Sequence, residues 1–171
     1  LKNINIIYRN YEGNNYYQNA IDLQRYCKKM NFKLYVANDK QLAARLSSHR
    51  LYLPSFNDSD YFPQSNFNVI GSAHNEMEIR QKIKQGCNEI FISPVFDTNS
   101  GIEKEGRGLA FYRLLMNKFS NQISIHALGG INKKNLNKII ASGSKGFSSK
   151  GMLEKKMNKS LISYLNLIAT N

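Results

Sequence analysis

Seven short apolar runs recur along the chain, and several are rich in β-branched or aromatic residues. Runs of this length and composition, bounded by polar and glycine-containing segments, are typical of buried β-strands. The predicted strands are residues 4–8, 33–37, 50–53, 68–71, 89–92, 123–127 and 145–148.

Between most of these runs, apolar residues recur at i, i+3 and i+4, which is the pattern of a helix with one buried face. Asn31, Gly86 and Gly143 stand where helix C-caps are expected. The predicted helices are residues 20–30, 40–46, 77–83, 109–119, 136–140 and 161–168.

The alternation of strands and helices over the whole length predicts βα units and a parallel sheet. Two architectures are compatible with it, an open doubly wound sheet and a closed barrel. Seven strands exceed the usual five or six of the open fold, and one more βα unit would complete eight. We therefore expect an α/β fold, a TIM-type (β/α) barrel lacking the first βα unit, in a single domain over residues 1–171.

The composition agrees with one globular domain, because 42% of the 171 residues are hydrophobic. No apolar run approaches the roughly 20 residues that span a bilayer, and the N-terminal residues do not resemble a signal peptide. We expect a cytoplasmic protein that does not enter membranes. Cys27 and Cys87 are far apart in the sequence, and they are expected to be two buried thiols in predicted helices.

The chain is basic, with 24 Lys and Arg residues against 12 Asp and Glu and a net charge of +12. Such a charge raises the question of a nucleic-acid partner. The lysines are spread along the chain, however, and the pairs Lys28–Lys29, Lys133–Lys134 and Lys155–Lys156 each sit on a predicted helix or its cap. The pattern favours solvated helix faces over a nucleic-acid groove, and the positive field would favour small anionic ligands.

Polar residues follow the early strands, at the carboxyl ends where both architectures place their ligands. Arg9 could bind phosphate through its guanidinium or form a surface ion pair. Asn38 and Asp39 follow the second strand, where Asp39 could hold magnesium or act as an N-cap. Ser72 and His74 come just past the fourth apolar run, as site residues or as helix caps.

Three later strand ends carry features of a phosphate site. The loop after the fifth strand supplies the hydroxyls of Thr98 and Ser100. Gly129–Gly130 follow the sixth strand and would let a ligand approach the backbone. The seventh strand ends in Ser148–Ser149, where backbone amides open the next predicted helix. In a full barrel the last two loops would be those that frequently bind phosphate.

In this order and spacing, the segments resemble the thiamine phosphate synthase and thiazole tautomerase family, as a divergent member. The resemblance covers nearly the whole chain and implies that the family's first βα unit is absent. The segments that carry it are IIYRNY, LYVANDKQLA, LYLPS, GSAHNEME, FISPVFDTNSG, ALGGI and GSKGFSS.

The resemblance implies a role in thiamine biosynthesis. In the synthase, a pyrimidine diphosphate ionises with Mg²⁺ assistance and a thiazole phosphate captures the resulting cation. Arg9 and Asn38–Asp39 match the diphosphate and magnesium residues, with Asp39 as the metal ligand, and Ser72 matches a pyrimidine-site serine. The positions at or beside the thiazole phosphate site are Thr98, Ser100, Gly130, Ser148 and Ser149.

Other positions depart from the synthase pattern. Ile7 and Tyr11 replace a glutamine and a lysine on either side of Arg9, Asn57 replaces a second metal carboxylate, and Gly101 replaces a lysine. Each change removes positive charge or metal ligation at the diphosphate. The resemblance therefore predicts binding of a thiazole phosphate or thiamine phosphate, with synthase turnover in doubt.

Two alternatives remain open. One is a thiazole tautomerase-like enzyme, although the catalytic histidine of that branch falls at Pro94 here, so His74 or His126 would have to replace it. The other is a non-catalytic module that binds a phosphate ligand. We take Arg9, Ser72 and His74 as the candidate catalytic residues. A barrel short of one strand exposes two sheet edges, which a homodimer or the apolar segment 161–165 would cover.

Overall fold

The computed structural model describes residues 5–9, 15–60, 66–98 and 104–149. They fall into two compact units. The first unit contains the described residues up to Tyr52 together with 66–68, and the second contains 53–60 and 69–149. Ser100, Lys155–Lys156 and the helix predicted over 161–168 lie outside the described residues.

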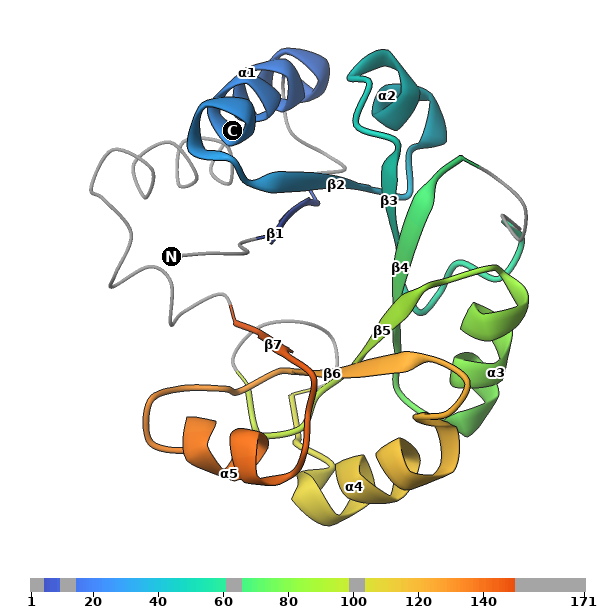
Figure 1. Cartoon of the computed structure of the whole chain (residues 1–171), viewed down its shortest axis with the longest axis vertical. Coiled ribbons are helices and arrows are strands. Elements are labelled where there is room, and N and C mark those ends of the chain that lie inside the picture. The colour runs from blue at the N-terminus through green and yellow to red at the C-terminus, as the bar shows by residue number, and fades with distance from the viewer. Residues whose placement is uncertain (1–4, 10–14, 61–65, 99–103, 150–171) are drawn as a thin grey trace. The chain divides into compact units, whose positions relative to one another are not determined.

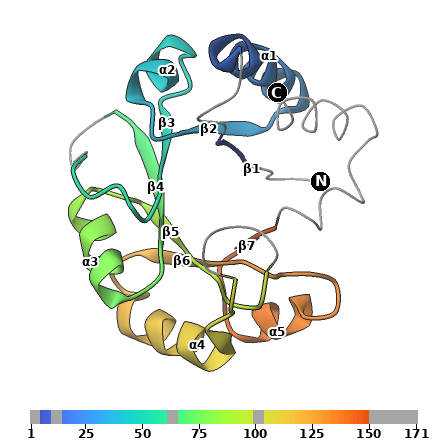
Figure 2. The ribbon, with the colours of Figure 1, turned by 180° about the vertical axis from the view of Figure 1, so that it is seen from behind.

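The first unit is built from β1 (Asn5–Tyr8), α1 (Tyr16–Met30), β2 (Lys33–Ala37), α2 (Lys40–Arg45) and β3 (Arg50–Leu53), of which the last residue belongs to the second unit. β1 pairs with β2 and β2 with β3, both in parallel. Figures 1 and 2 show α1 and α2 on the same side of β2.

The helix α1 forms because its apolar residues share one face. Ala20, Leu23 and Cys27 are spaced at i, i+3 and i+7, and all three are almost fully buried. The helix ends at Asn31, whose φ of 56° lies in the left-handed region that asparagine tolerates. The C-cap predicted at this position is confirmed.

The second unit continues with β4 (Asn68–Ala73), α3 (Glu76–Lys84), β5 (Glu89–Ile92), α4 (Gly108–Phe119), β6 (Ser124–Leu128), α5 (Leu136–Ala141) and β7 (Phe147–Ser148); Asn68 belongs to the first unit. The strands β4 to β7 pair in chain order, all in parallel. Figures 1 and 2 show α3, α4 and α5 on one side of these strands.

Within β5 and β6 burial alternates from residue to residue. Ile90, Ile92, Ile125 and Ala127 are at most 2% exposed, so they form the core under the helices. The alternate positions, which include Glu89, Phe91, Ser124 and His126, are only partly buried. The face of the sheet that turns away from the helices therefore carries polar and titratable side chains.

The strand β4 runs further than its apolar pattern predicts. We expected Ser72 just past the strand end, but β4 continues to Ala73, with Ser72 opposite Phe91 and 5% exposed. Backbone pairing with β5 continues the strand whatever the polarity of its side chains. A Cβ atom added to Gly71 would lie 2.9 Å from Lys82 Cδ of α3, so Ser72, which alternates with it, points to the face away from the helices.

The two cysteines are buried and unpaired, as predicted. Their placement was predicted only in part, because Cys27 lies in α1 whereas Cys87 follows the end of α3. Among the described residues, no helix combines the length and the apolar character that crossing a bilayer demands.

Candidate functional site

In the first unit, the predicted ligands follow the strands as expected. Arg9 is exposed directly after β1. Asn38 follows β2 with a φ of 56°, and its N–H donates to the Tyr52 carbonyl at 2.9 Å. Asp39 is the N-cap of α2, where its Oδ1 accepts the Leu42 N–H at 2.8 Å. The N-cap interpretation of Asp39 is thus confirmed, and its role as a metal ligand stays a prediction.

A metal site does not emerge from the described residues. Within them, no group of three or more His, Cys, Asp or Glu side chains is placed to hold an ion. Asn57, which replaces a carboxylate of the resembled family, is 8% exposed. Its Nδ2 donates to Asp60 Oδ2 at 2.7 Å and its Oδ1 accepts from Gln85 Nε2 at 3.0 Å. The Asn57 amide is therefore engaged within the protein.

A buried lysine supports the loop after β3, and the sequence did not point to it. Lys82 of α3 is fully buried. Its Nζ donates to the Asn57 carbonyl at 2.5 Å and to Gln85 Oε1 at 2.8 Å. Burial lowers the pKa of Lys82. A lysine in an amphipathic helix ordinarily indicates the solvent side, so only the packing reveals this one.

The loop after β5 is hydrogen-bonded to the end of β6. The Val95 N–H donates to the Leu128 carbonyl at 2.9 Å, and the Phe96 N–H donates to the Gly129 carbonyl at 3.2 Å. The loop that carries Thr98 therefore lies along the segment that carries the paired glycines.

The paired glycines are needed for this approach. A Cβ atom at Gly129 would lie 2.7 Å from Pro94 Cα, and one at Gly130 would lie 2.3 Å from the Asp97 carbonyl oxygen. Both glycines also have positive φ, 93° and 64°. Both glycines therefore make room for the backbone of the neighbouring loop, and their expected role beside a ligand stays a prediction.

The last residue of β7 and the residue after it contact the same segment. Ser148 pairs with Leu128, and Ser149 Oγ donates to the Ile131 carbonyl at 2.9 Å. The segments after β5, β6 and β7 are thus held together by direct contacts, as the strand order predicts. Thr98 itself donates its N–H to the Lys104 carbonyl at 2.9 Å.

Two consecutive backbone donors stand at this junction. Among the residues that the structure describes, the N–H groups of Gly130 and Ile131 have no hydrogen-bond acceptor. The Gly130 carbonyl accepts from Asn132 Nδ2 at 3.2 Å and Asn135 Nδ2 at 2.9 Å, which orients this peptide. Adjacent N–H groups without acceptors are the usual components of an anion-binding turn.

His74 lies directly after β4, with both ring nitrogens in contact with neighbouring loops. Its Nδ1 is 2.5 Å from the Ser93 carbonyl oxygen and its Nε2 is 3.0 Å from Ser55 Oγ. Its backbone N–H donates to Glu78 Oε2 at 2.8 Å. Catalytic roles for His74, Ser72 and Arg9 stay predictions.

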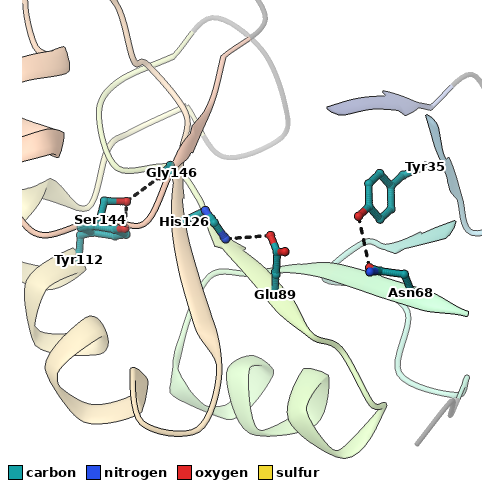
Figure 3. A network of polar contacts seen from close by, with 7 residues as sticks. All are labelled: Tyr35, Asn68, Glu89, Tyr112, His126, Ser144 and Gly146. Carbon is teal, nitrogen blue, oxygen red and sulfur yellow. Dashed lines mark hydrogen bonds and ion pairs between the residues drawn. The ribbon is translucent and has the colours of Figure 1, made fainter. Parts of the chain in front are cut away.

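A second histidine lies within a strand and not at a strand end. Figure 3 shows His126 of β6 beside Glu89, with Nε2 2.9 Å from Glu89 Oε2. The distance is that of an ion pair, but Nε2 lacks hydrogen-bond geometry. Burial lowers the pKa of His126, Glu89 opposes this shift, and Lys145 adds to it. Because it lies in the middle of β6, His126 is not part of the loops where ligands are expected.

Figure 3 also shows how the residue before β7 is fixed. Ser144 Oγ donates to the Gly146 carbonyl at 2.7 Å and lies 2.6 Å from the Tyr112 hydroxyl. A Cβ atom at Gly146 would lie 2.6 Å from His126 Nδ1. A larger residue here would have to displace the histidine ring, so the glycine lets the chain pass close to that ring on its way into β7.

Parallel strands in chain order, helices over one face and joined loops after β5, β6 and β7 define an α/β protein of the TIM type. The fold is shared with a thiamine phosphate pyrophosphorylase from Pyrococcus furiosus, with a TM-score of 0.67 and 18% identity over 96% of this chain and 83% of that one. Residues 4–150 match the family model for thiamine monophosphate synthase. The chain belongs to this family.

Curated relatives agree with this assignment. A thiamine-phosphate synthase of Prochlorococcus marinus subsp. pastoris is 30% identical over 135 residues, 75% of this chain and 38% of the relative. Thiamine-phosphate synthase 1 of Streptococcus pneumoniae is 29% identical over 133 residues, 75% of this chain and 63% of the relative. The chain thus spans under two thirds of the length of both relatives.

Proposed function

We propose that this chain binds a thiazole phosphate or thiamine phosphate through the phosphate monoester, and so takes part in thiamine biosynthesis. The observation that carries the proposal is the pair of N–H groups at Gly130 and Ile131 that, within the described residues, have no acceptor. They stand where the segments after β5 and β7 meet the end of β6. Membership of the thiamine monophosphate synthase family supports this choice of ligand.

The donors of this site follow from the contacts around it. A phosphate monoester needs hydrogen-bond donors, and Gly130, Ile131 and the Ser148 hydroxyl would supply them. The Ser149 hydroxyl already donates to the Ile131 carbonyl, so we assign it to holding the third segment in place. Thr98 would contribute from the loop after β5, and the resemblance adds Ser100 from the same loop.

Synthase turnover is a separate step of the proposal. It would require a pyrimidine diphosphate and Mg²⁺, for which Arg9, Asp39 and Ser72 would be the recognition residues. The engaged amide of Asn57 favours a second candidate, ligand binding without turnover. Incubation with thiazole phosphate, pyrimidine diphosphate and Mg²⁺ separates the two, because only a synthase forms thiamine phosphate.

Calorimetric titration of the whole chain tests the binding step. Thiazole phosphate should release measurable heat, whereas the dephosphorylated thiazole alcohol should bind far more weakly because its anion is missing. Ser148→Ala should weaken binding about tenfold or more, the usual effect of removing one hydrogen bond to a charged group. Ser120→Ala changes an exposed serine at the end of α4 and should leave the affinity unchanged. Absence of binding by both thiazole phosphate and thiamine phosphate would refute the proposal.

A further inference from the structure

We propose that His74 is a positioning residue: its imidazole holds the start of the loop after β5, and thereby places the backbone that packs on Gly129 and Gly130. The ligand class in this inference rests on the proposed function, while the positioning of the loop does not. The starting observation is that one side chain contacts two different strand-end loops, at Ser93 and at Ser55.

The hydrogen bonds assign the tautomer of the ring. The Ser93 carbonyl can only accept, so Nδ1 carries the proton and donates to it. In the neutral imidazole Nε2 then has a lone pair, and it accepts from the Ser55 hydroxyl. Both ring nitrogens are thus engaged by protein groups, which argues for positioning over proton transfer.

The backbone of His74 is held by hydrogen bonds at the N-terminus of α3. Asn75 is the N-cap of α3 and accepts the Glu78 N–H at 2.9 Å. The Glu78 carboxylate returns, accepting from Asn75 Nδ2 at 2.7 Å and from the His74 N–H at 2.8 Å. This arrangement resembles a capping box, except that the returning carboxylate accepts the N–H of the residue before the cap, and it ties the histidine to the first turn of α3. The ring is therefore presented from a rigid helix end.

The Ser93 peptide is held on both sides by the end of β4. Its N–H donates to the Ala73 carbonyl at 3.2 Å, and its carbonyl accepts from His74. Pro94 is the next residue, and it packs so closely on Gly129 that a side chain at position 129 would collide with it. Val95 and Phe96 follow, with their bonds to the end of β6. The ring thus lies one residue from the contact with Gly129.

Two substitutions separate the two ring contacts. In His74→Asn, the amide Nδ2 can occupy the place of Nδ1 and donate to Ser93, while the Ser55 contact is lost. In His74→Gln, the amide reaches the place of Nε2 and the Ser93 contact is lost. Ser55→Ala removes the Nε2 partner alone and serves as the matched control for the second contact.

Amide hydrogen exchange of the whole chain, read at Val95 and Phe96, tests the positioning without any ligand. We expect exchange about tenfold faster in His74→Gln, the factor that one buried hydrogen bond supplies. His74→Asn and Ser55→Ala should stay within about twofold of the unmodified chain. Equal exchange in all four proteins, or equal acceleration in His74→Asn and His74→Gln, would overturn the inference.

Titration with thiazole phosphate then connects the loop to the site. We expect His74→Gln to weaken binding about tenfold and His74→Asn to preserve it, in parallel with exchange. Loss of turnover in both variants, with exchange and affinity unchanged, would make His74 a catalytic residue and refute positioning. If the unmodified chain binds no thiazole phosphate while the exchange pattern holds, the ligand proposal fails and the positioning role stands.

Discussion

At the scale of single residues, burial decides what a titratable side chain does. His126 is 14% exposed and faces Glu89 across the sheet. The Phe91 ring lies beside its ring in a tilted arrangement, with 5.4 Å between the centroids. The desolvation that lowers its pKa outweighs the attraction of the carboxylate. In the folded chain this histidine therefore resists protonation.

The stability of the chain should depend on pH through His126. The folded pKa lies below the ordinary value of 6.5, so below about pH 6.5 the unfolded chain binds a proton that the folded chain does not. The free energy of unfolding should fall as the pH drops from 7. Below the pKa of His126 in the folded chain, this histidine should cause no further loss. Urea unfolding at several pH values should show a smaller loss in His126→Gln. His49 is exposed, so His49→Asn serves as the control and should lose as much stability at low pH as the unmodified chain. Identical pH profiles for the unmodified chain and both variants would contradict the argument.

At the scale of elements, side-chain caps set where α2 and α3 begin. α2 has only six residues, too few to be stable by propensity alone. Its first turn depends on Asp39, which satisfies the Leu42 N–H. The same residue is the candidate magnesium ligand, so its two roles must be separated.

Substitutions at Asp39 distinguish the cap from the charge. Asp39→Ala should lower the free energy of unfolding by about 1 kcal/mol, because an N-cap is lost. Asp39→Asn should retain nearly all of that stability, since asparagine caps as well as aspartate does. Chemical denaturation measures both. If Asp39→Asn stays stable but loses a Mg²⁺-dependent activity, the carboxylate acts on metal as well; equal stability of all three proteins would contradict the capping role.

At the scale of the whole molecule, the net charge of +12 creates a positive field that attracts anions of any kind. This field is screened by salt, whereas short hydrogen bonds at a site are screened far less. The charge should therefore assist a phosphate ligand without defining it.

Salt should separate these two contributions. Raising NaCl from about 50 to about 500 mM should weaken thiazole phosphate binding only a few-fold, because screening shortens the range of the field while the backbone donors remain. Calorimetry at each salt concentration measures the change. The thiazole alcohol, which lacks the phosphate charge, is the control whose binding should not depend on the positive field. A loss of a hundredfold or more would mean that the charge, and not the Gly130 and Ile131 amides, holds the ligand.

Much of the secondary structure of this protein could be predicted from the sequence. Apolar periodicity alone places the strands β1, β2, β3 and β5 within a residue of their ends, and the cap at Asn31 follows from its residue type. These features depend on interactions between residues that are close in the sequence, so the sequence alone is enough to predict them. The order of the strand ends also suffices to bring the segments after β5, β6 and β7 together.

What the amino-acid sequence by itself determined is thus the βα order, the parallel fold and the family. Only the tertiary structure decided that Ser72 lies inside β4, that Lys82 is buried, and that the paired glycines admit a neighbouring loop. Each of these outcomes depends on a partner far away in the chain. The physical reason is that burial and hydrogen-bond partnership are properties of pairs in space, which a residue type cannot specify alone.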